Sequence, residues 1–409
     1  MRALPTLVLV ASCACSCAHS ARGPSAQPCD VLPVNAAAAL MTFATDPGGG
    51  IALGGESGGR LRAGTAATDA PGGFVLRANG GGAVLWIRPM GPARPLALTI
   101  APDGGTVVVG QSQRHCIAAR LDGQGREVWA STLAGDGESA CRAVAFDERT
   151  GDIWAAGEFT GTVGPTRAAG LTDAFVVRIS GVTGEIRLVH TFGGKGAEHA
   201  TALALTDAGD VIVAGTFGRD VDASLSEVSF GSGSVRAADG TDGFVVALQP
   251  DGTTRWVSVV GEHGDDEVVG IEARESAVYA VANLHRPRDG ARCGGQAAIL
   301  RNRDWVQVEE DECVAARALT FDDAGRLWVL ENAGRTLRAR AFASTDGAAL
   351  GTRTWAAERA SVRGIGIARV PGGFAAAATT DGELTVCGKP VGSAGERTPF
   401  VVWVRDLAP

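Results

Sequence analysis

The 409-residue sequence lacks the short motifs that mark common enzyme chemistries. It contains no H-E-x-x-H, Walker or EF-hand loop. It also lacks a basic cluster, because Lys and Arg are scattered singly and the formal net charge is -8, with an isoelectric point near 5.4. Such a chain lacks the basic surface that binds nucleic-acid phosphates independently of sequence. We therefore expect no nucleic-acid partner.

Two further features of the composition exclude collagen-like and disordered chains. The 58 glycines follow no three-residue period, so the chain is not collagen-like, and they indicate many turns instead. Disorder is a poor interpretation, because hydrophobic residues make up 45% of the chain and charged residues 20%. That composition supplies enough apolar material for a large core.

The first twenty residues have the layout of an export signal. One basic residue precedes an apolar run over residues 3–11, which is too short to cross a bilayer as a helix. The four residues at 10–13, VASC, resemble the bacterial lipobox, in which the Cys receives lipid and becomes the new N-terminus. The resemblance implies a signal peptide at 1–12 and lipidation of Cys13. Cys15 and Cys17 are weaker alternatives, because neither has Leu or Val three residues before it. Residues 14–28 would follow the lipidated Cys13 as a flexible tether, so that the anchor and tether span 13–28.

The same resemblance predicts where the protein resides. Ala14 stands where inner-membrane lipoproteins carry a retention Asp, so the outer membrane is favoured, with a periplasmic or a surface-facing orientation left open. An ordinary secreted protein whose signal contains Cys is the alternative. Residues 29–409 form the folded part in either case.

Beyond the signal and the tether, six cysteines remain, at positions 29, 116, 141, 293, 313 and 387. An even number in an exported chain favours disulfides over metal ligation, and none of these cysteines lies in a C-x-x-C motif or at zinc spacing with His. We therefore expect no metal site, and the pairing must come from the repeat.

Two kinds of hairpin alternate along the chain. The first is a small-aliphatic strand, an Asp/Gly turn and a second aliphatic strand that usually ends in Gly. Asp and Gly recur at the bend because Gly adopts positive φ without steric cost and Asp bonds its own backbone in tight turns. Seven copies lie at residues 39–55, 96–110, 142–157, 201–215, 268–283, 316–332 and 364–379.

The second kind of hairpin opens on an aromatic or aliphatic residue and leaves through a strand that often carries Trp. The Trp follows the opening residue by twelve positions in three copies, while one copy has Arg187 in its place, and we assign these Trp side chains to packing between repeats. The pairs are Phe74 with Trp86, Ile117 with Trp129 and Phe244 with Trp256, and less regular copies carry Trp305 and Trp355. A seventh copy begins at Phe400 and has no second strand.

Seven pairs of hairpins predict an all-β, seven-bladed β-propeller of four-stranded antiparallel blades, with about 54 residues per blade over residues 29–409. The last blade lacks its outermost strand, and residues 30–34 precede the first hairpin without a partner. We expect this N-terminal strand to join the last blade and close the ring. Ring symmetry then pairs Cys116 with Cys141, Cys293 with Cys313, and Cys29 with Cys387.

Two family resemblances accompany this interpretation. Residues 172–217 and 229–260 resemble the seven-bladed bacterial β-propeller (SBBP) repeat, in which an Asp-Ala-Phe-Val strand leads through a Gly-Gly loop to an Ala-rich strand pair. That family implies an exported propeller and carries no shared catalytic motif. Residues 118–131 are more weakly similar to quinoprotein-like propellers, a family with quinone-dependent dehydrogenases and a lipoprotein subunit of the outer-membrane barrel-assembly machinery. We expect no dehydrogenase cofactor, because no adjacent Cys pair and no clear Ca²⁺ ligand set are present.

Acidic residues and His gather in the connections that lead into the first strand of each blade, which should converge near a central channel. Such a group could bind a cation or supply acid and base chemistry. The favoured interpretation is that they are solvated loop residues, because no metal-ligand spacing or repeated ligand position supports the other. The residues are Glu138, Glu198, His199, His263, Asp265, Asp266, Glu267, Asp311 and Glu312.

Three functions remain. The leading one is a monomeric, non-enzymatic interaction module on the outer membrane that binds a protein, glycan or small ligand through its loops, with the connections at 158–172 and 218–242 as the first candidates. The second is a scaffold in envelope assembly. The third is a hydrolase or lyase that uses the channel carboxylates.

Overall fold

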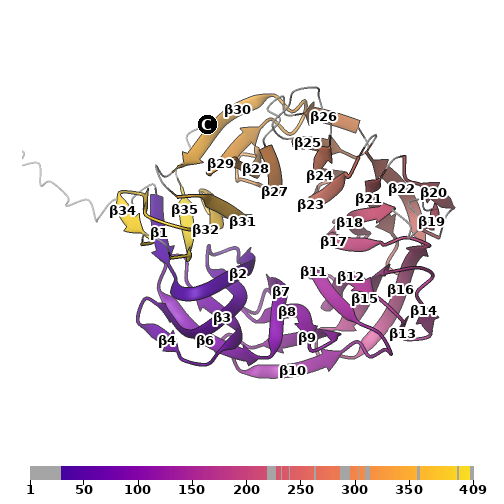
Figure 1. Cartoon of the computed structure of the whole chain (residues 1–409), viewed down its shortest axis with the longest axis horizontal. Coiled ribbons are helices and arrows are strands. Elements are labelled where there is room, and N and C mark those ends of the chain that lie inside the picture. Colours follow the sequence, from indigo (N-terminus) through magenta and orange to yellow (C-terminus); the bar gives the residue numbers. More distant parts are fainter. Residues whose placement is uncertain are drawn as a thin grey trace, which may run out of the picture.

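The computed structural model describes residues 29–405 apart from short interruptions at 219–226, 232, 239, 262–263, 286–294, 303, 309–313, 357–359 and 394–395. This part of the chain forms strands and their connections, without helices, and so holds no helix that could span a membrane. Seven sheets stand around a central channel, and the first strand of each lies innermost (Figure 1). The predicted seven-bladed β-propeller is confirmed.

The first four blades follow the chain from the inside of the ring outward. Blade 1 contains β2 (Asn35–Thr45), β3 (Ile51–Ala63), β5 (Gly72–Ala78) and β6 (Val84–Gly91), and β4 (Ala66–Thr68) pairs with β3. Blade 2 contains β7 (Ala93–Ile100), β8 (Thr106–Ser112), β9 (His115–Leu121) and β10 (Glu127–Thr132). Blade 3 contains β11 (Ser139–Asp147), β12 (Asp152–Phe159), β15 (Asp173–Ser180) and β16 (Ile186–Gly194). Blade 4 contains β17 (His199–Leu205), β18 (Val211–Gly218), β21 (Thr241–Leu248) and β22 (Thr254–Val260).

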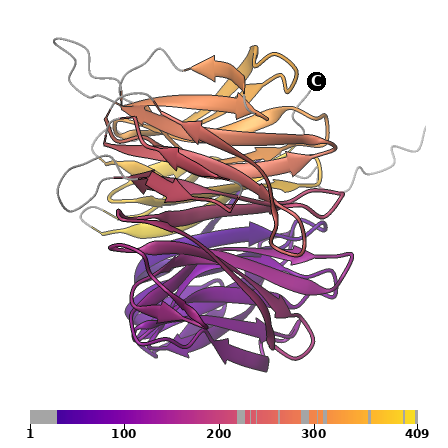
Figure 2. The same cartoon turned by 90° about the vertical axis from the view of Figure 1, so that its right-hand side faces the viewer.

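The other three blades complete the ring. Blade 5 contains β23 (Glu267–Arg274), β24 (Ala277–His285), β25 (Gly295–Arg301) and β26 (Asp304–Val308). Blade 6 contains β27 (Val314–Phe321), β28 (Leu327–Ala333), β29 (Thr336–Phe342) and β30 (Ala349–Trp355). Blade 7 contains β31 (Val362–Val370), β32 (Gly373–Thr380), β35 (Thr398–Val404) and, outermost, β1 (Cys29–Pro33). Seen from the side, the strands cross the thickness of the ring (Figure 2).

The N-terminal strand closes the ring as predicted. β1 pairs antiparallel with β35, from Cys29 opposite Val404 to Pro33 opposite Phe400, and lies beside it in Figure 1. The Cys29–Cys387 disulfide fixes this junction with a Cα–Cα distance of 5.5 Å. The predicted Cys116–Cys141 disulfide is also confirmed, at 5.1 Å, and joins blades 2 and 3. Cys293 and Cys313 lie outside the described residues.

Tryptophans on outer strands bind the turns of the next blade. Trp86 of β6 donates its indole N–H to the Gly123 carbonyl of blade 2 at 3.0 Å, and Trp129 of β10 does the same to Gly181 of blade 3 at 3.0 Å. Blade 3 has Arg187 at this position, and Arg187 instead bonds Asp152 within its own blade at 2.7 Å. The repeated Trp therefore joins consecutive blades, as the spacing indicated.

Every inner strand bends at the same place. A register shift occurs between the inner and second strands of all seven blades, at residues 41, 96, 142, 201, 269, 317 and 365. In blades 1 to 4 the second strand has Gly opposite the residue before this bulge. A Cβ on Gly157 would lie 1.8 Å from the Ala140 carbonyl oxygen, and one on Gly215 would lie 1.8 Å from that of His199. The Gly that ends the first kind of hairpin is thus required by close backbone approach.

Three connections between second and third strands form extra hairpins. They are β13–β14 (Thr162–Val163 and Thr166–Arg167), β19–β20 (Glu227–Ser229 and Ser234–Arg236) and β33–β34 (Leu384–Val386 and Lys389–Val391). β19 leaves blade 4 and pairs with β16 of blade 3, and the buried Phe230 beside it contacts Phe192 and Phe244. The described parts of the connections at 158–172 and 218–242 therefore contribute packing between and over the blades.

Candidate functional site at the channel mouth

The two faces of the ring differ in their connections. Because neighbouring strands are antiparallel, each inner strand starts at the face where the second strand ends and the third begins. We call this the long-loop face, since the extra hairpins leave from it. The opposite short-turn face carries only connections of two to six residues within the blades.

Most side chains that line the channel are apolar, although polar atoms form the larger part of its exposed surface. All seven inner strands contribute the residue at the bulge or those just after it, at positions 41–43, 96–98, 142–144, 202–203, 270–271, 318–319 and 365–367. These residues enclose a cavity of about 270 Å³, and Arg142 is the only ionisable side chain among them. Ionisable side chains other than Arg142 therefore lie outside the cavity lining.

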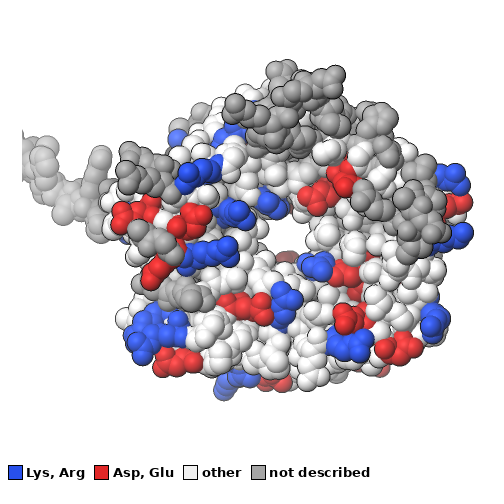
Figure 3. Space-filling model, in the orientation of Figure 1, with Lys and Arg blue, Asp and Glu red and all other residues white. Residues whose placement is uncertain are grey.

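Charged side chains meet at the long-loop end of the inner strands. Arg94 of β7 lies 3.2 Å from Glu56 of β3, and the Arg142 Nε of β11 lies 2.6 and 2.7 Å from the two oxygens of Glu158 on β12. The space-filling view shows acidic and basic groups together around the central opening (Figure 3). Both pairs join an inner strand to a second strand near the opening, so the mouth is held by ion pairs.

His199, the first residue of β17, stands beside one of these pairs. Its Nδ1 lies 4.0 Å from Glu158 Oε2. Burial holds the pKa of His199 below its ordinary value, and the Glu158 charge offsets only part of that effect. The imidazole is therefore neutral near pH 7, while Arg142 engages both Glu158 oxygens.

Glu267 and Asn283 connect blades 5 and 6. Asn283 donates to Glu267 at 2.9 Å and to the Ala316 carbonyl at 3.2 Å, and its side-chain oxygen accepts the Ala316 N–H at 2.7 Å. These bonds use the amide fully and leave the Glu267 carboxylate partly exposed at the mouth.

The structure does not bring the candidate residues together. His199 and Glu267 begin inner strands at the mouth, whereas Glu198 and Asp266 are buried between blades. Glu138 is exposed and pairs with Arg114 at 3.4 Å, and Asp265 accepts hydrogen bonds from Thr241 at 3.2 Å. His263, Asp311 and Glu312 lie outside the described residues. No group of three or more potential metal ligands occurs within the described ranges.

Glu198 belongs to a buried carboxyl pair at the junction of blades 3 and 4. It is 0% exposed, and its Oε2 accepts the Gly194 N–H at 2.9 Å, while Asp173 Oδ2 accepts the Ala169 N–H at 3.0 Å. Burial raises the pKa of Glu198 to about 8, helped by the Asp173 charge, and burial also raises the pKa of Asp173. Glu198 Oε1 and Asp173 Oδ1 are both buried without a hydrogen-bond partner.

The junction of blades 4 and 5 also contains two buried carboxyl groups, Asp242 and Asp266. A Cβ built on Gly261 would lie 2.5 Å from both Asp242 Oδ1 and Asp266 Oδ2, so the two carboxyl groups flank the same glycine. Asp242 accepts the Ala238 N–H at 2.7 Å, and Asp266 accepts the His285 N–H at 2.6 Å. These residues secure the connections between blades 4 and 5.

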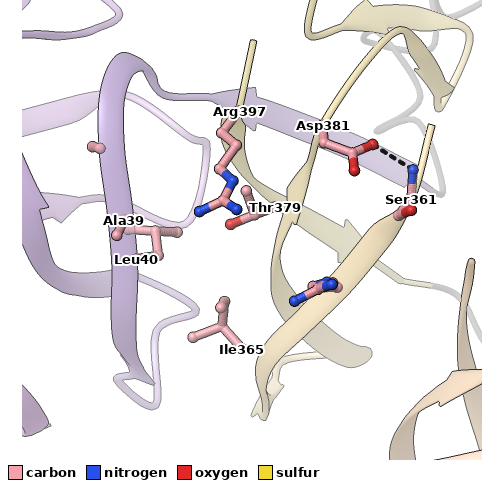
Figure 4. Close-up of a pocket in the computed structure, with 9 residues that line it drawn as sticks. Ala39, Leu40, Ser361, Ile365, Thr379, Asp381 and Arg397 are labelled. Carbon is pink, nitrogen blue, oxygen red and sulfur yellow. Dashed lines mark hydrogen bonds between the residues drawn. The ribbon is translucent and has the colours of Figure 1, made fainter. Parts of the chain in front are cut away.

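A separate pocket lies where blade 7 meets blade 1, on the long-loop face. It has a volume of about 180 Å³, and Ile365 lines both this pocket and the channel, so the two adjoin. Figure 4 shows Arg397 extending beside Thr379 toward Ala39 and Leu40 of β2, with Asp381 near the start of β31. Arg363 also lines the pocket. Asp381 accepts the Ser361 N–H at 2.5 Å, which orients its carboxylate.

The sequence did not predict most of the charged residues at the channel mouth. Glu56 and Glu158 each follow the Gly that ends the first kind of hairpin, and Gln111 and Thr216 occupy the same place in blades 2 and 4. This recurrent polar position after the Gly is the signal that could have found them. Arg363 and Arg397 carry no such signal.

The chain was compared with protein families, curated proteins and solved structures. No protein-family model matches the chain, and no curated protein does. A catalytically inactive virginiamycin B lyase from Staphylococcus aureus with quinupristin is 12% identical, with 92% of this chain and 100% of that one covered and a TM-score of 0.45. The Dos1 propeller is 7% identical, with coverage of 90% and 92% and a TM-score of 0.47. A protein of unknown function from Bacteroides caccae is 13% identical, with coverage of 64% and 77% and a TM-score of 0.36.

Proposed function

We propose that the protein is an exported propeller that binds a small ligand at the mouth of its channel on the long-loop face, without catalysing a reaction. The channel itself carries this proposal. It is a cavity of about 270 Å³ to which all seven blades contribute mostly apolar side chains, with polar atoms exposed between them and charged groups at its mouth. Small-molecule sites usually combine an apolar lining with a few placed polar groups.

The arrangement of His199 favours binding over acid and base chemistry. Glu158, the carboxylate nearest to His199, already engages Arg142 through both oxygens. Glu198, the carboxylate adjacent in sequence, is buried between blades, where a substrate in the channel has no access to it. The mouth groups therefore suit hydrogen bonding to a ligand.

The proposed location is the outer membrane, with Cys13 as the lipid anchor. The lipobox-like residues 10–13 and the disulfides Cys29–Cys387 and Cys116–Cys141 support export, since disulfides persist in oxidising compartments. A Cys13→Ser variant that still fractionates with membranes would contradict the anchor.

Filling the channel tests the binding proposal. Ala97 and Ala318 line the cavity from blades 2 and 6, so Trp at either position should occupy it. Val182, 78% exposed on a turn of blade 3, offers a matched Trp control outside the channel. Each protein would be incubated with a small-molecule extract of bacterial envelopes and analysed by native mass spectrometry.

We expect the wild type and Val182→Trp to retain the same compound, and Ala97→Trp and Ala318→Trp to lose it. Two independent filling variants guard against one of them failing to fold, which melting curves would reveal. Retention by all four proteins would exclude the channel as the site. Conversion of the retained compound by the wild type would exclude a purely binding function.

A further inference from the structure

The pocket between blades 7 and 1 contains two arginines that pair with no acidic side chain among the described residues. Arg94 and Arg142 pair with Glu56 and Glu158, as described above. Arg363 and Arg397 form no ion pair or hydrogen bond with any part of the chain that the structure describes. Both are exposed, so water solvates them at present and a ligand can reach them.

The other groups of the pocket are complementary to an anion that also carries hydroxyl groups. Thr379 can donate and accept, and the Asp381 carboxylate has one oxygen on the Ser361 N–H and a second that can accept from a ligand hydroxyl. Ala39, Leu40 and Ile365 form the apolar side of the pocket. Two guanidinium groups against one carboxylate leave a net positive charge.

The size of the pocket limits the ligand. Its volume of about 180 Å³ is below the roughly 300–1,000 Å³ of pockets that enclose drug-sized molecules. A guanidinium binds a carboxylate through two parallel N–H···O bonds, which gives orientation as well as attraction.

We propose that this pocket binds a sugar acid, a monosaccharide-sized hydroxylated unit with one carboxylate that Arg363 and Arg397 hold while Asp381 and Thr379 bond its hydroxyl groups. The inference rests on the proposed function, since it assigns a ligand class to a pocket adjoining the same channel mouth. The ligand's apolar C–H face would lie on Ala39, Leu40 and Ile365.

Titration calorimetry of the full mature chain with D-glucuronate, D-glucose and inorganic phosphate tests the assignment. We expect glucuronate to bind and glucose and phosphate to bind at least about tenfold more weakly. Arg363→Ala and Arg397→Ala should each weaken glucuronate binding about tenfold or more, because each loses charge-assisted hydrogen bonds. Raising the salt concentration should weaken wild-type binding further, since exposed charges are screened.

The controls separate the pocket from its surroundings. Glu396→Gln changes the charge next to Arg397 outside the pocket lining and should leave glucuronate affinity within about twofold. Arg397→Lys keeps the charge without the planar fork and should give an intermediate loss. Because both arginines are exposed, their variants should melt with the wild type.

Each outcome decides the assignment. Absence of glucuronate binding, equal binding of glucose, tighter binding of phosphate, or unchanged affinity in both Arg→Ala variants would overturn it. If the sugar-acid assignment fails in this way but Ala97→Trp and Ala318→Trp lose an envelope compound that the wild type retains, the proposed channel function is still supported. If the arginine variants lose glucuronate binding but no compound binds in the channel, the sugar-acid pocket is supported and the proposed channel function is rejected.

Discussion

At the scale of single residues, the most unusual groups are the buried carboxyls Glu198 and Asp173. Each has one oxygen on a backbone N–H and one buried oxygen without a partner. The charge of Asp173 disfavours ionisation of Glu198, and two interacting carboxyls titrate with one strongly raised pKa. Glu198 therefore carries a proton at neutral pH at this junction of blades 3 and 4.

The raised pKa values of this pair make the folded protein less stable as pH rises. The pKa of Glu198 is about 8 in the folded protein against 4.5 as its ordinary value, so the folded state binds the proton more tightly. The stabilisation is complete below pH 4.5 and is lost as pH rises toward 8, with a slope of up to about 1.4 kcal/mol per pH unit. Asp173, whose pKa burial also raises, contributes with the same sign. Glu198→Gln should flatten this slope in urea unfolding measured at pH 5, 6.5 and 8.

Glu185→Gln, at an exposed turn of blade 3, is the matched control and should keep the wild-type slope. An unchanged slope in Glu198→Gln would show that the proton does not reside at this pair. The sequence could not predict the pair, because Glu198 precedes β17 and its burial depends on how blade 4 packs against blade 3. His199 stands at the channel mouth while its neighbour Glu198 is buried between blades.

At the scale of elements, the bulge in every inner strand shapes the channel wall. Asp/Gly turns are local signals, so the sequence alone predicted the seven first hairpins. Asp322 shows the cause, since its carboxylate accepts the Ala324 and Arg326 N–H groups at 3.0 Å each while Gly325 adopts a φ of 78°. The bulge escaped prediction because it depends on register between strands, for which the recurrent Gly was only an indirect sign.

Gly157→Ala tests the close approach at the bulge of blade 3. Its Cβ would lie 1.8 Å from the Ala140 carbonyl oxygen, so the two strands must separate. We expect the free energy of unfolding to fall by about 2 to 3 kcal/mol or more, measured by guanidinium titration. Gly351→Ala in the outer strand β30, with nothing within 4 Å of its Cβ, should change stability by less than about 0.5 kcal/mol. Equal effects at both sites would contradict this account of the glycine.

At the scale of the whole molecule, closure brings together residues that are far apart in the sequence. The unpaired N-terminal segment and the missing last strand predicted the closure, and ring symmetry predicted the Cys29–Cys387 disulfide. The pocket that contains Arg363 and Arg397 escaped prediction, because it forms only when β2 of the first blade meets β31 of the last. Local patterns thus located the blades, and the junction between first and last blade created the candidate ligand site.

The two described disulfides should differ in their contribution to stability. Cys29 and Cys387 are 358 positions apart, whereas Cys116 and Cys141 are 25 apart. A cross-link that closes a longer loop restricts the unfolded chain more, by up to about 5 kcal/mol against about 3 kcal/mol. In guanidinium unfolding without reductant, Cys29→Ser/Cys387→Ser should therefore lose more stability than Cys116→Ser/Cys141→Ser. A larger loss for the shorter loop would count against this model.

The position of the Cys29–Cys387 disulfide also decides how the ring bears mechanical load. Cys29 is the first residue of β1, so tension on the segment before it meets a covalent bond before it meets the β1–β35 hydrogen bonds. The sulfur bridge passes that tension to the β33–β34 hairpin of blade 7. A ring pulled from its N-terminal segment would therefore stay closed, because the disulfide carries the force and β1, the strand that completes blade 7, is not peeled away.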